Sequence, residues 1–248
     1  MTIKDLYNYG RQKIAHESLI LCEELYGFSR QKILTNPDTE IDNSDIFLDA
    51  IKRRLNGEPL QYVLGYWYFD DIRLTVKDGV LIPREDSLVL VDCAEKFIKN
   101  NNYKIVDLCS GTGAIALAIA KRCKNTQIEA VELFETAYNC LCENIDKHEK
   151  GRVVPKNLDI FSSQKLYNNL DVIVSNPPYI ATKEISELDI EVQNEPHTAL
   201  DGGADGLDFY RHICQNWKFA LRKGGLLAVE IGETQGEEVY KLFEENGF

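Results

Sequence analysis

The sequence predicts an α/β protein in which helices cover both faces of a parallel sheet, preceded by a small helical bundle. Two observations carry this prediction. Residues 1 to about 60 show helical spacing of apolar residues and no convincing strand, whereas short apolar strands alternate with helical patterns after Pro83. Strands joined by helices imply right-handed crossovers between parallel neighbours. A chain of 248 residues suffices for one large domain, or for a medium one with a small appendage.

The first third of the chain divides into a helical part and a hairpin. Ser29 is an expected helix N-cap, and Gly57 and Pro59 end the last of three or four helices. From Tyr66 to Ile82 aromatic and β-branched residues alternate with polar ones, which predicts a β-hairpin. We therefore expect a helical domain over residues 1–62, a hairpin linker over 63–83 and an α/β domain over 84–248.

The α/β part is predicted element by element from its periodicity. Helices are expected near residues 86–98, 113–122, 134–147, 206–221 and 235–245, and strands near 103–108, 127–131, 153–157, 171–175 and 225–231. No internal repeat or low-complexity tract interrupts this alternation.

Composition excludes several classes of protein. A net charge of −12 argues against a phosphate-dominated partner, so we expect no direct nucleic-acid contact. Solubility alone explains the acidity, and a basic protein partner is the functional alternative. No window approaches the ~18 apolar residues of a membrane span, and the seven cysteines contain no CxxC pair. We therefore expect a cytoplasmic protein with free thiols. We also expect no metal site, because the four histidines show no ligand spacing.

The run KIVDLCSGTGAIALAIA predicts a buried strand, a glycine turn and a helix. Gly111 and Gly113 would let the backbone approach a nucleotide-like ligand at the helix N-terminus, a pattern that also fits the dinucleotide loop of NAD enzymes. Asp107 precedes them, and the resulting Asp-x-Cys-x-Gly-x-Gly resembles the acidic-first loop of S-adenosylmethionine methyltransferases, with Cys109 in place of a glycine. A small residue there permits close approach, although left-handed backbone geometry would be strained.

Glu132 ends the next predicted strand, and its carboxylate can accept hydrogen bonds from both hydroxyls of a ribose. The alternative is an ordinary solvated acid at a strand end. The glycine loop one unit earlier favours the ribose interpretation.

The strongest motif is Asn176-Pro177-Pro178-Tyr179, directly after a predicted strand and hence at the sheet edge where open α/β sheets bind ligands. Two prolines remove two backbone donors, which leaves the Pro177 carbonyl and the Asn176 side chain to accept hydrogen bonds from one NH2 group. Tyr179 can stack on the plane that carries this group. The motif therefore predicts methylation of a planar NH2 nitrogen, either of a nucleic-acid base or of a glutamine side chain.

Further motifs separate these two classes. The chain resembles the release factor glutamine methyltransferases of the HemK/PrmC family. The matching motifs occur in the family's order, from the helical part to the last residue. The resemblance rests on GEPLQYVLG at 57–65, VLIPREDS at 80–87, the glycine loop, Glu195-Pro196, ALDGGADGLDFYR at 199–211 and VEIG at 229–232.

The resemblance implies a Rossmann-like class I fold that uses S-adenosylmethionine to methylate the glutamine of the Gly-Gly-Gln motif in peptide chain release factors. It also implies that the helical domain helps dock the factor and that Asn176, Pro177 and Tyr179 are catalytic, with Pro178 also binding substrate. We separately expect the protein to be a monomer. The implied cofactor contacts are Asp107, Cys109, Ser110, Gly111, Thr112, Gly113, Glu132, Asp159, Ile160 and Asn176. Ile160 stands where family members often have an aromatic residue, so apolar contact rather than stacking is expected.

Some alternatives stay open. Arg84 can steer a ligand or be an exposed strand-end arginine. A ribosomal-protein glutamine methyltransferase shares the catalytic tetrapeptide, a base methyltransferase would need a basic aromatic groove, and a non-catalytic scaffold need not bind the cofactor. Methyltransferases of this fold usually end with a further β-hairpin, and we expect it to be missing because the sequence stops at Phe248.

Overall fold

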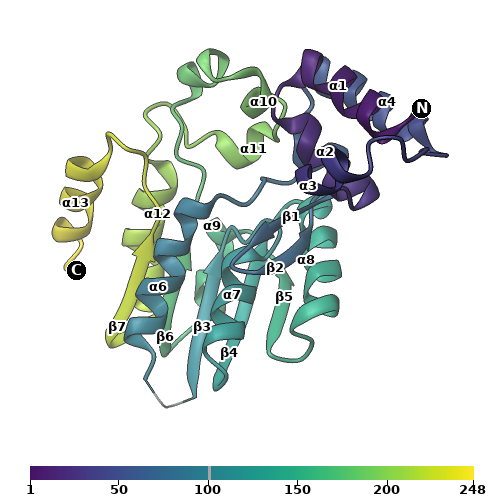
Figure 1. The fold of residues 1–248 in the computed structure, drawn as a ribbon. Coiled ribbons are helices and arrows are strands. Elements are labelled where there is room, and N and C mark those ends of the chain that lie inside the picture. Colours follow the sequence, from purple (N-terminus) through teal and green to yellow (C-terminus); the bar gives the residue numbers. More distant parts are fainter. Residues whose placement is uncertain (100–101) are drawn as a thin grey trace. The chain divides into compact units, whose positions relative to one another are not determined.

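The computed structural model describes residues 1–99 and 102–248. The chain divides into two compact units, which Figure 1 draws as ribbons. The helical unit contains Met1–Gly65 and Ile190–Asn194, and the sheet unit contains Tyr66–Asp189 and Glu195–Phe248.

The helical unit is built from amphipathic helices around a small apolar core. Its helices are α1 (Ile3–Ile14), α2 (Glu17–Tyr26), α3 (Arg30–Thr35), α4 (Ser44–Leu55), α5 (Leu60–Leu64) and the distant α10 (Ile190–Gln193). Ser29 caps α3 by accepting a hydrogen bond from the Lys32 amide, as the sequence predicted. The helix α5 was not predicted, because it starts directly after the proline that was expected to end the helical pattern.

A buried arginine explains why residues 190–194 belong to this unit. Arg54, on α4, pairs with Glu17 at 2.7 Å and with Glu191 at 2.6 Å, and Asn194 donates to the Gly57 carbonyl. A buried guanidinium needs such charged partners. Glu191 lies 137 positions from Arg54, so no local pattern could have predicted this pairing.

The sheet unit holds a five-stranded parallel sheet with the order β5-β4-β3-β6-β7 and a separate antiparallel hairpin, β1-β2. The strands are β1 (Tyr66–Phe69), β2 (Ile72–Thr75), β3 (Tyr103–Leu108), β4 (Thr126–Glu132), β5 (Val153–Asn157), β6 (Leu170–Ser175) and β7 (Leu221–Val229). The helices are α6 (Leu88–Phe97), α7 (Ala114–Arg122), α8 (Glu135–His148), α9 (Ile160–Ser163), α11 (His197–Leu200), α12 (Asp208–Asn216) and α13 (Gly236–Glu245). Four short 3₁₀ turns are η1 (Glu85–Ser87), η2 (Gln164–Leu166), η3 (Thr182–Glu187) and η4 (Trp217–Phe219).

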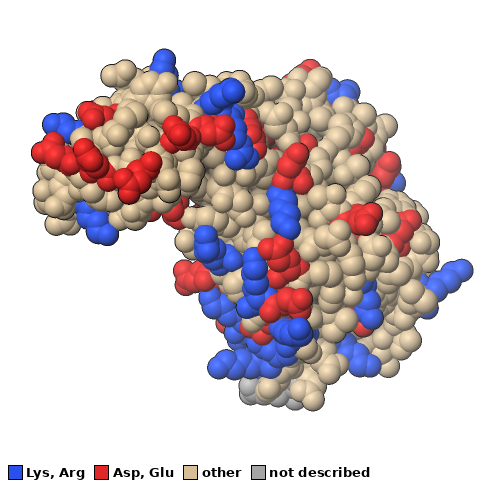
Figure 2. All heavy atoms as spheres, turned by 90° about the vertical axis from the view of Figure 1, so that its right-hand side faces the viewer, with Lys and Arg blue, Asp and Glu red and all other residues tan. Residues whose placement is uncertain are grey.

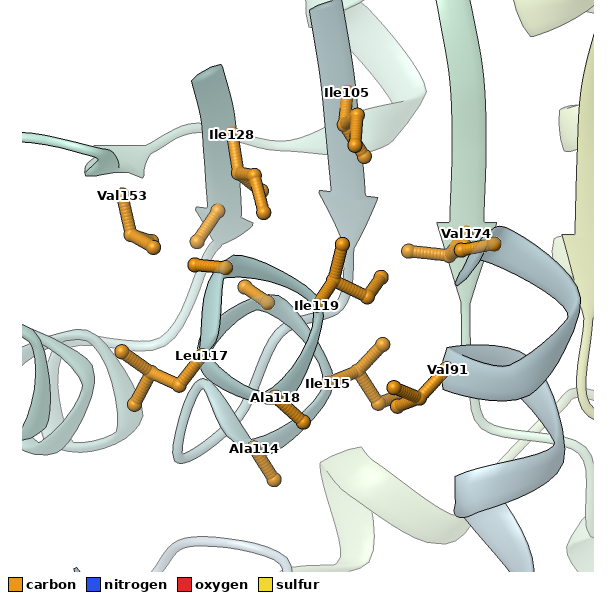
Figure 3. Packing of buried hydrophobic residues seen from close by; sticks show 14 of the residues in the cluster. Val91, Ile105, Ala114, Ile115, Leu117, Ala118, Ile119, Ile128, Val153 and Val174 are labelled. Atoms are coloured by element: carbon orange, nitrogen blue, oxygen red, sulfur yellow. The ribbon is translucent and has the colours of Figure 1, made fainter. Parts of the chain in front are cut away.

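Helices cover both faces of this sheet, which confirms the predicted fold class. On one face α6, α7 and α8 pack against the strands, and Figure 3 shows Ile115, Ile119 and Val91 pointing toward one another beneath Ile105 and Val174. On the other face η4 and α12 bury Trp217 and Ile213. Alternate residues of β3 therefore face opposite cores, as a doubly covered parallel sheet requires.

The strand register sets the position of the site. Leu108, the last residue of β3, lies opposite Val131 on β4 and opposite Ser175 on β6. The three segments that follow these strands therefore leave the sheet side by side at its carboxyl edge.

Two predicted elements differ from the structure. The helix expected over 206–221 ends at Asn216, because Trp217 is fully buried with its indole donating to the Ile160 carbonyl at 3.0 Å and lies in the tighter turn η4. β7 consequently begins earlier than predicted, and a register irregularity against β6 follows its first residue.

The hairpin expected to extend to Ile82 ends at Thr75. The amide and the carbonyl of Thr75 bond to the buried side chain of Asn144 on α8, at 2.7 and 3.0 Å. Asn144 also donates to the Thr112 carbonyl at 3.0 Å, so one carboxamide joins the hairpin, α8 and the glycine loop.

We predict that Asn144→Ala lowers the free energy of unfolding by about 2–4 kcal/mol, because it removes the hydrogen bonds to the Thr75 amide and the Thr112 carbonyl and leaves the Thr75 carbonyl with the weak thiol donor of Cys140. Urea denaturation measures this change. Asn139→Ala is the matched control, since Asn139 is an exposed asparagine on the same helix, and we expect it to alter stability by less than about 0.5 kcal/mol. Equal effects of the two substitutions would contradict the structural role of Asn144.

Candidate active site

A cavity of about 350 Å³ opens at the carboxyl edge of the sheet, where the segments after β3, β4 and β6 meet. Nine of the residues predicted to bind cofactor or substrate line it: Cys109, Ser110, Gly111, Thr112, Glu132, Asp159, Ile160, Asn176 and Pro178. The other four predicted residues, Asp107, Gly113, Pro177 and Tyr179, lie outside its lining. The sheet topology thus brings together residues that are up to 69 positions apart.

The glycine loop folds back on the strand that precedes it. Cys109 adopts a left-handed conformation with φ 60°, which costs a non-glycine residue about 1 kcal/mol. The Ser110 amide donates to the Val131 carbonyl and the Ser110 hydroxyl to the Asp107 carbonyl, at 3.0 and 2.8 Å. Burial and the neighbouring carboxylates raise the pKa of the Cys109 thiol, so this cysteine is a neutral part of the cavity wall.

Glu132 is fixed by the loops on either side of it. Its two carboxylate oxygens accept hydrogen bonds from the amides of Gly111 and Phe134, both at 2.9 Å, and it is only 7% exposed. Burial raises its pKa, while these hydrogen bonds lower it. Each oxygen keeps a further lone pair, so the carboxylate can still accept from a pair of hydroxyl groups in the cavity.

Asp107 lies beneath the loop instead of in the cavity. It is completely buried, and within residues 1–99 and 102–248 no hydrogen bond reaches either carboxylate oxygen. Burial in this environment raises the pKa of Asp107 to about 7. The sequence motif therefore identified an acid at the correct strand end, but its side chain faces the protein interior.

Part of the cavity wall is apolar and contains Leu133, Phe134, Leu158, Ile160 and Phe161. Asp159 caps α9 by accepting from the Phe161 amide at 2.8 Å. Phe161 is 43% exposed and contacts the His212 ring, with a centroid separation of 4.4 Å. An aromatic ring therefore lies at the cavity wall one residue beyond Ile160, a possibility that the sequence interpretation missed.

Two residues of the Asn-Pro-Pro-Tyr segment, Asn176 and Pro178, line the cavity, and the segment is anchored by contacts outside it. The Nδ2 group of Asn176 donates to the Ser87 hydroxyl at 3.1 Å, while among the described residues no hydrogen bond reaches its Oδ1. Pro177 and Pro178 are buried. Tyr179 is half-buried against Leu207, Tyr210 and Val239, and its carbonyl accepts from Gln235 at 2.9 Å.

Sequence reasoning did not identify the partner of Arg84. Arg84 lines the cavity and forms an ion pair with Glu195, whose other oxygen accepts from the Ile82 amide at 2.9 Å. Glu195 is 5% exposed, and Pro196 to Ala199 directly after it line the cavity. This pair connects two walls of the cavity, so Arg84 is more than an exposed strand-end arginine.

The DGGADG segment forms the expected turn, with Asp201 Oδ1 accepting from the Gly203 amide at 3.0 Å. Gly206 has φ +76°, and a Cβ there would lie 2.4 Å from the Tyr179 carbonyl oxygen. Close packing of this turn against the Asn-Pro-Pro-Tyr segment thus requires glycine. In the described ranges, no cluster of three or more His, Cys, Asp or Glu could hold a metal ion, and no helix is long and apolar enough to cross a bilayer.

The buried state of Asp107 predicts a pH-dependent stability. Its pKa is about 7 in the folded protein against an ordinary value of 3.8, so the folded state binds more protons between these pH values and stability falls as pH rises. Relative to Asp107→Asn, the wild-type free energy of unfolding should fall on the order of 2 kcal/mol between pH 5 and pH 8. Urea titrations of both proteins measure it, and a pH-independent difference would count against the buried carboxyl.

Gly206→Ala should lower the unfolding temperature by at least about 4 °C, because the new methyl group collides with the Tyr179 carbonyl and the backbone is left-handed. Gly236→Ala is its control, since no atom lies within 4 Å of a Cβ there and its φ is not positive. Thermal unfolding followed by circular dichroism compares them. If both variants unfold at the wild-type temperature, the close approach is not required.

Comparisons with known proteins agree with this geometry. The Methyltransferase small domain family matches residues 86–204, and the PrmC N-terminal domain family matches residues 3–65. Among solved structures, the hMettl16 catalytic domain in complex with MAT2A 3'UTR hairpin 6 has a TM-score of 0.59 at 13% identity, over 83% of this chain and 74% of that chain. A methyltransferase from Pyrococcus furiosus has a TM-score of 0.50 at 19% identity, over 71% and 76%. These two likenesses show the fold alone.

Relatives of similar length share more of the sequence. The release factor glutamine methyltransferase of Thermodesulfovibrio yellowstonii is 36% identical over 99% of this chain and 89% of that protein. Its counterpart in Clostridium botulinum is 37% identical over 100% of this chain and 93% of that protein. The chain therefore belongs to the release factor glutamine methyltransferase family and is an S-adenosylmethionine-dependent methyltransferase.

Proposed function

We propose that this protein transfers a methyl group from S-adenosylmethionine to the side-chain amide nitrogen of the glutamine in the Gly-Gly-Gln motif of peptide chain release factors, in the cytoplasm. The relatives named for this activity support the proposal. The single observation that carries it is the Asn176 carboxamide, whose Oδ1 is without a protein hydrogen bond among the described residues while Asn176 lines the cavity. An unpaired acceptor is what binding of an NH2 group requires.

The cavity suits the proposed cofactor. Glu132 offers two carboxylate oxygens for ribose hydroxyls, and the apolar wall around Ile160 and Phe161 offers contact area for an adenine. A Cβ at Gly111 would meet no protein atom within 4 Å, so the loop backbone has open space beside it. When bound, S-adenosylmethionine supplies a methyl group that the positive sulfur already activates. We propose that Cys109 to Gly113, Glu132, Asp159, Ile160 and Asn176 hold it, with Asp107 supporting the loop from below.

The chain's contribution to the reaction is orientation. The nitrogen of an amide has a delocalised lone pair and is a poor nucleophile unless both of its N–H bonds are held. We propose that Asn176 Oδ1 and the Pro177 carbonyl accept these two hydrogen bonds and that Pro178 and Tyr179 confine the amide plane. Orientation of this kind can lower a barrier by about 7–11 kcal/mol in favourable cases, so no strong base is required, and the released proton can pass to water.

The substrate is proposed to be a protein instead of a nucleic acid. Figure 2 shows acidic and basic side chains mixed on one face of the molecule. Several arginines and lysines of the sheet unit form ion pairs, including Arg122 with Asp70 and Lys77 with Glu143, so part of the positive charge of this unit is neutralised. A base methyltransferase would need a groove of free cations. We propose further that residues 1–62 dock the release factor and that the protein acts as a monomer.

We predict that incubation of an unmethylated release factor with this protein and S-adenosylmethionine adds one methyl group to the glutamine of the Gly-Gly-Gln motif. Peptide mass spectrometry detects it. Asn176→Ala should reduce the rate at least about 100-fold, because one of the two acceptors for the NH2 group is lost. Asn139→Ala, on the surface of α8, should retain the wild-type rate.

The alternatives are separate outcomes of the same assay. Methylation of a ribosomal protein and not of the release factor would move the substrate assignment to that class. Cofactor binding without transfer to a release factor, a ribosomal protein or a nucleic acid would instead support a non-catalytic scaffold.

A further inference from the structure

Three polar side chains from distant parts of the sequence are connected by hydrogen bonds at the wall of the cavity, which Ser87 and Asn176 line. The Ser87 hydroxyl donates to Glu230 Oε2 at 2.5 Å, and Asn176 Nδ2 donates to the Ser87 oxygen at 3.1 Å. Ser87 lies 89 positions from Asn176 and 143 positions from Glu230. The fold therefore builds this arrangement by tertiary contact alone.

The sheet register places Asn176 and Glu230 together. Ser175 on β6 lies opposite Val229 on β7, so Asn176 and Glu230 are the first residues beyond two paired strands. The Glu230 backbone is fixed independently of its side chain: its amide donates to the Ser175 carbonyl and its carbonyl accepts from the Tyr210 hydroxyl, both at 2.9 Å. Substitution of the Glu230 side chain thus leaves these backbone anchors in place.

Ser87 occupies a helix N-cap position, but its side chain does not cap the helix. It is the N-cap residue of α6, a position from which serine commonly accepts a hydrogen bond from the first turn of the helix. Its side chain makes no such bond here, and Ser87 is only 4% exposed. The hydroxyl instead bridges Asn176 and Glu230.

The chemistry of the three side chains fixes which group donates and which accepts in each hydrogen bond. An ionised carboxylate only accepts hydrogen bonds, so Glu230 obliges the Ser87 hydroxyl to donate to it. The Ser87 oxygen is then available to Asn176 only as an acceptor. Asn176 must therefore turn its NH2 group toward Ser87, which leaves Oδ1 as the group that can face a substrate. With the opposite direction, Asn176 would present NH2 to the substrate NH2 group, and two donors would meet.

We propose that Glu230 and Ser87 are positioning residues that set the orientation of the Asn176 carboxamide, so that its oxygen and not its nitrogen receives the target NH2 group. This inference rests on the proposed function, since it concerns how the same site recognises its substrate. Glu230 does not itself line the cavity. Its carboxylate accepts from Ser87, and it lies close enough to the Asn176 side chain for that group to lower the pKa of Glu230, so it acts on Asn176 both through Ser87 and directly.

A double-mutant cycle on methyl transfer tests the proposal. Glu230→Gln keeps the shape of the side chain but can donate as well as accept, so it no longer dictates the direction of the Ser87 hydroxyl. We expect Glu230→Gln and Ser87→Ala each to lower kcat about tenfold, the loss of roughly one hydrogen bond to a charged group, with the dissociation constant of S-adenosylhomocysteine changed less than about threefold. In the Ser87→Ala background, Glu230→Gln should lower kcat less than tenfold, because only the direct interaction of Glu230 with Asn176 remains. Two effects that multiply in full would overturn the proposal, because Glu230 and Ser87 would then not act on the same carboxamide.

The matched control is Glu233→Gln, an exposed glutamate three residues beyond Glu230, which should keep the wild-type kcat. A second readout does not depend on activity. Solution NMR of the ¹⁵N-labelled protein reports the side-chain NH2 signals of Asn176, identified by their absence in Asn176→Asp. Both Glu230→Gln and Ser87→Ala should shift these signals and speed their exchange with water, whereas unchanged signals in Glu230→Gln would overturn the proposal. Wild-type protein that transfers no methyl group would contradict the proposed function, and the NMR result would still decide the orientation of Asn176.

Discussion

Three neighbouring parallel strands, β4, β3 and β6, end at the same edge of the sheet, and the site depends on this constraint. Because Leu108 lies opposite both Val131 and Ser175, the glycine loop, Glu132 and Asn176 emerge at one edge of the sheet. The helices on both faces bury the strands and fix this register, since a shift of one residue would turn every side chain of a strand to the wrong face. The position of the cavity thus depends on strand pairing more than on any particular side chain.

Two buried carboxylates, Glu132 and Glu195, and the half-buried carboxylate of Glu230 then connect the loops that surround the cavity. Glu132 holds the glycine loop through the Gly111 amide, Glu195 holds the segment around Ile82 and Arg84, and Glu230 holds Ser87. Each of these acids satisfies its buried charge with donors from a different segment, which is the usual requirement for burying a charge. Asp107 is the exception, because no hydrogen bond among the described residues reaches its carboxylate, and burial raises its pKa to about 7. The contacts that satisfy these carboxylate charges are therefore the same contacts that hold the loops in place.

The sequence predicted those parts of the fold and site that local patterns encode. Strand and helix periodicity gave the parallel sheet, and residues directly after a strand, such as Cys109, Glu132 and Asn176, could be assigned to one edge by the geometry of crossovers. Contacts between distant segments carry no such local signal. Asn144, Glu195 and the pair formed by Ser87 and Glu230 act through partners 32 to 143 positions away, and the early end of α12 follows from the burial of Trp217.

The most direct test of this account is a crystal structure of the protein with S-adenosylhomocysteine and a peptide that contains the Gly-Gly-Gln motif. The account predicts that Asn176 Oδ1 and the Pro177 carbonyl oxygen both lie about 3 Å from the glutamine side-chain nitrogen, with Asn176 Nδ2 still bonded to Ser87. Density that places the glutamine nitrogen away from Asn176, or against Asn176 Nδ2, would contradict it.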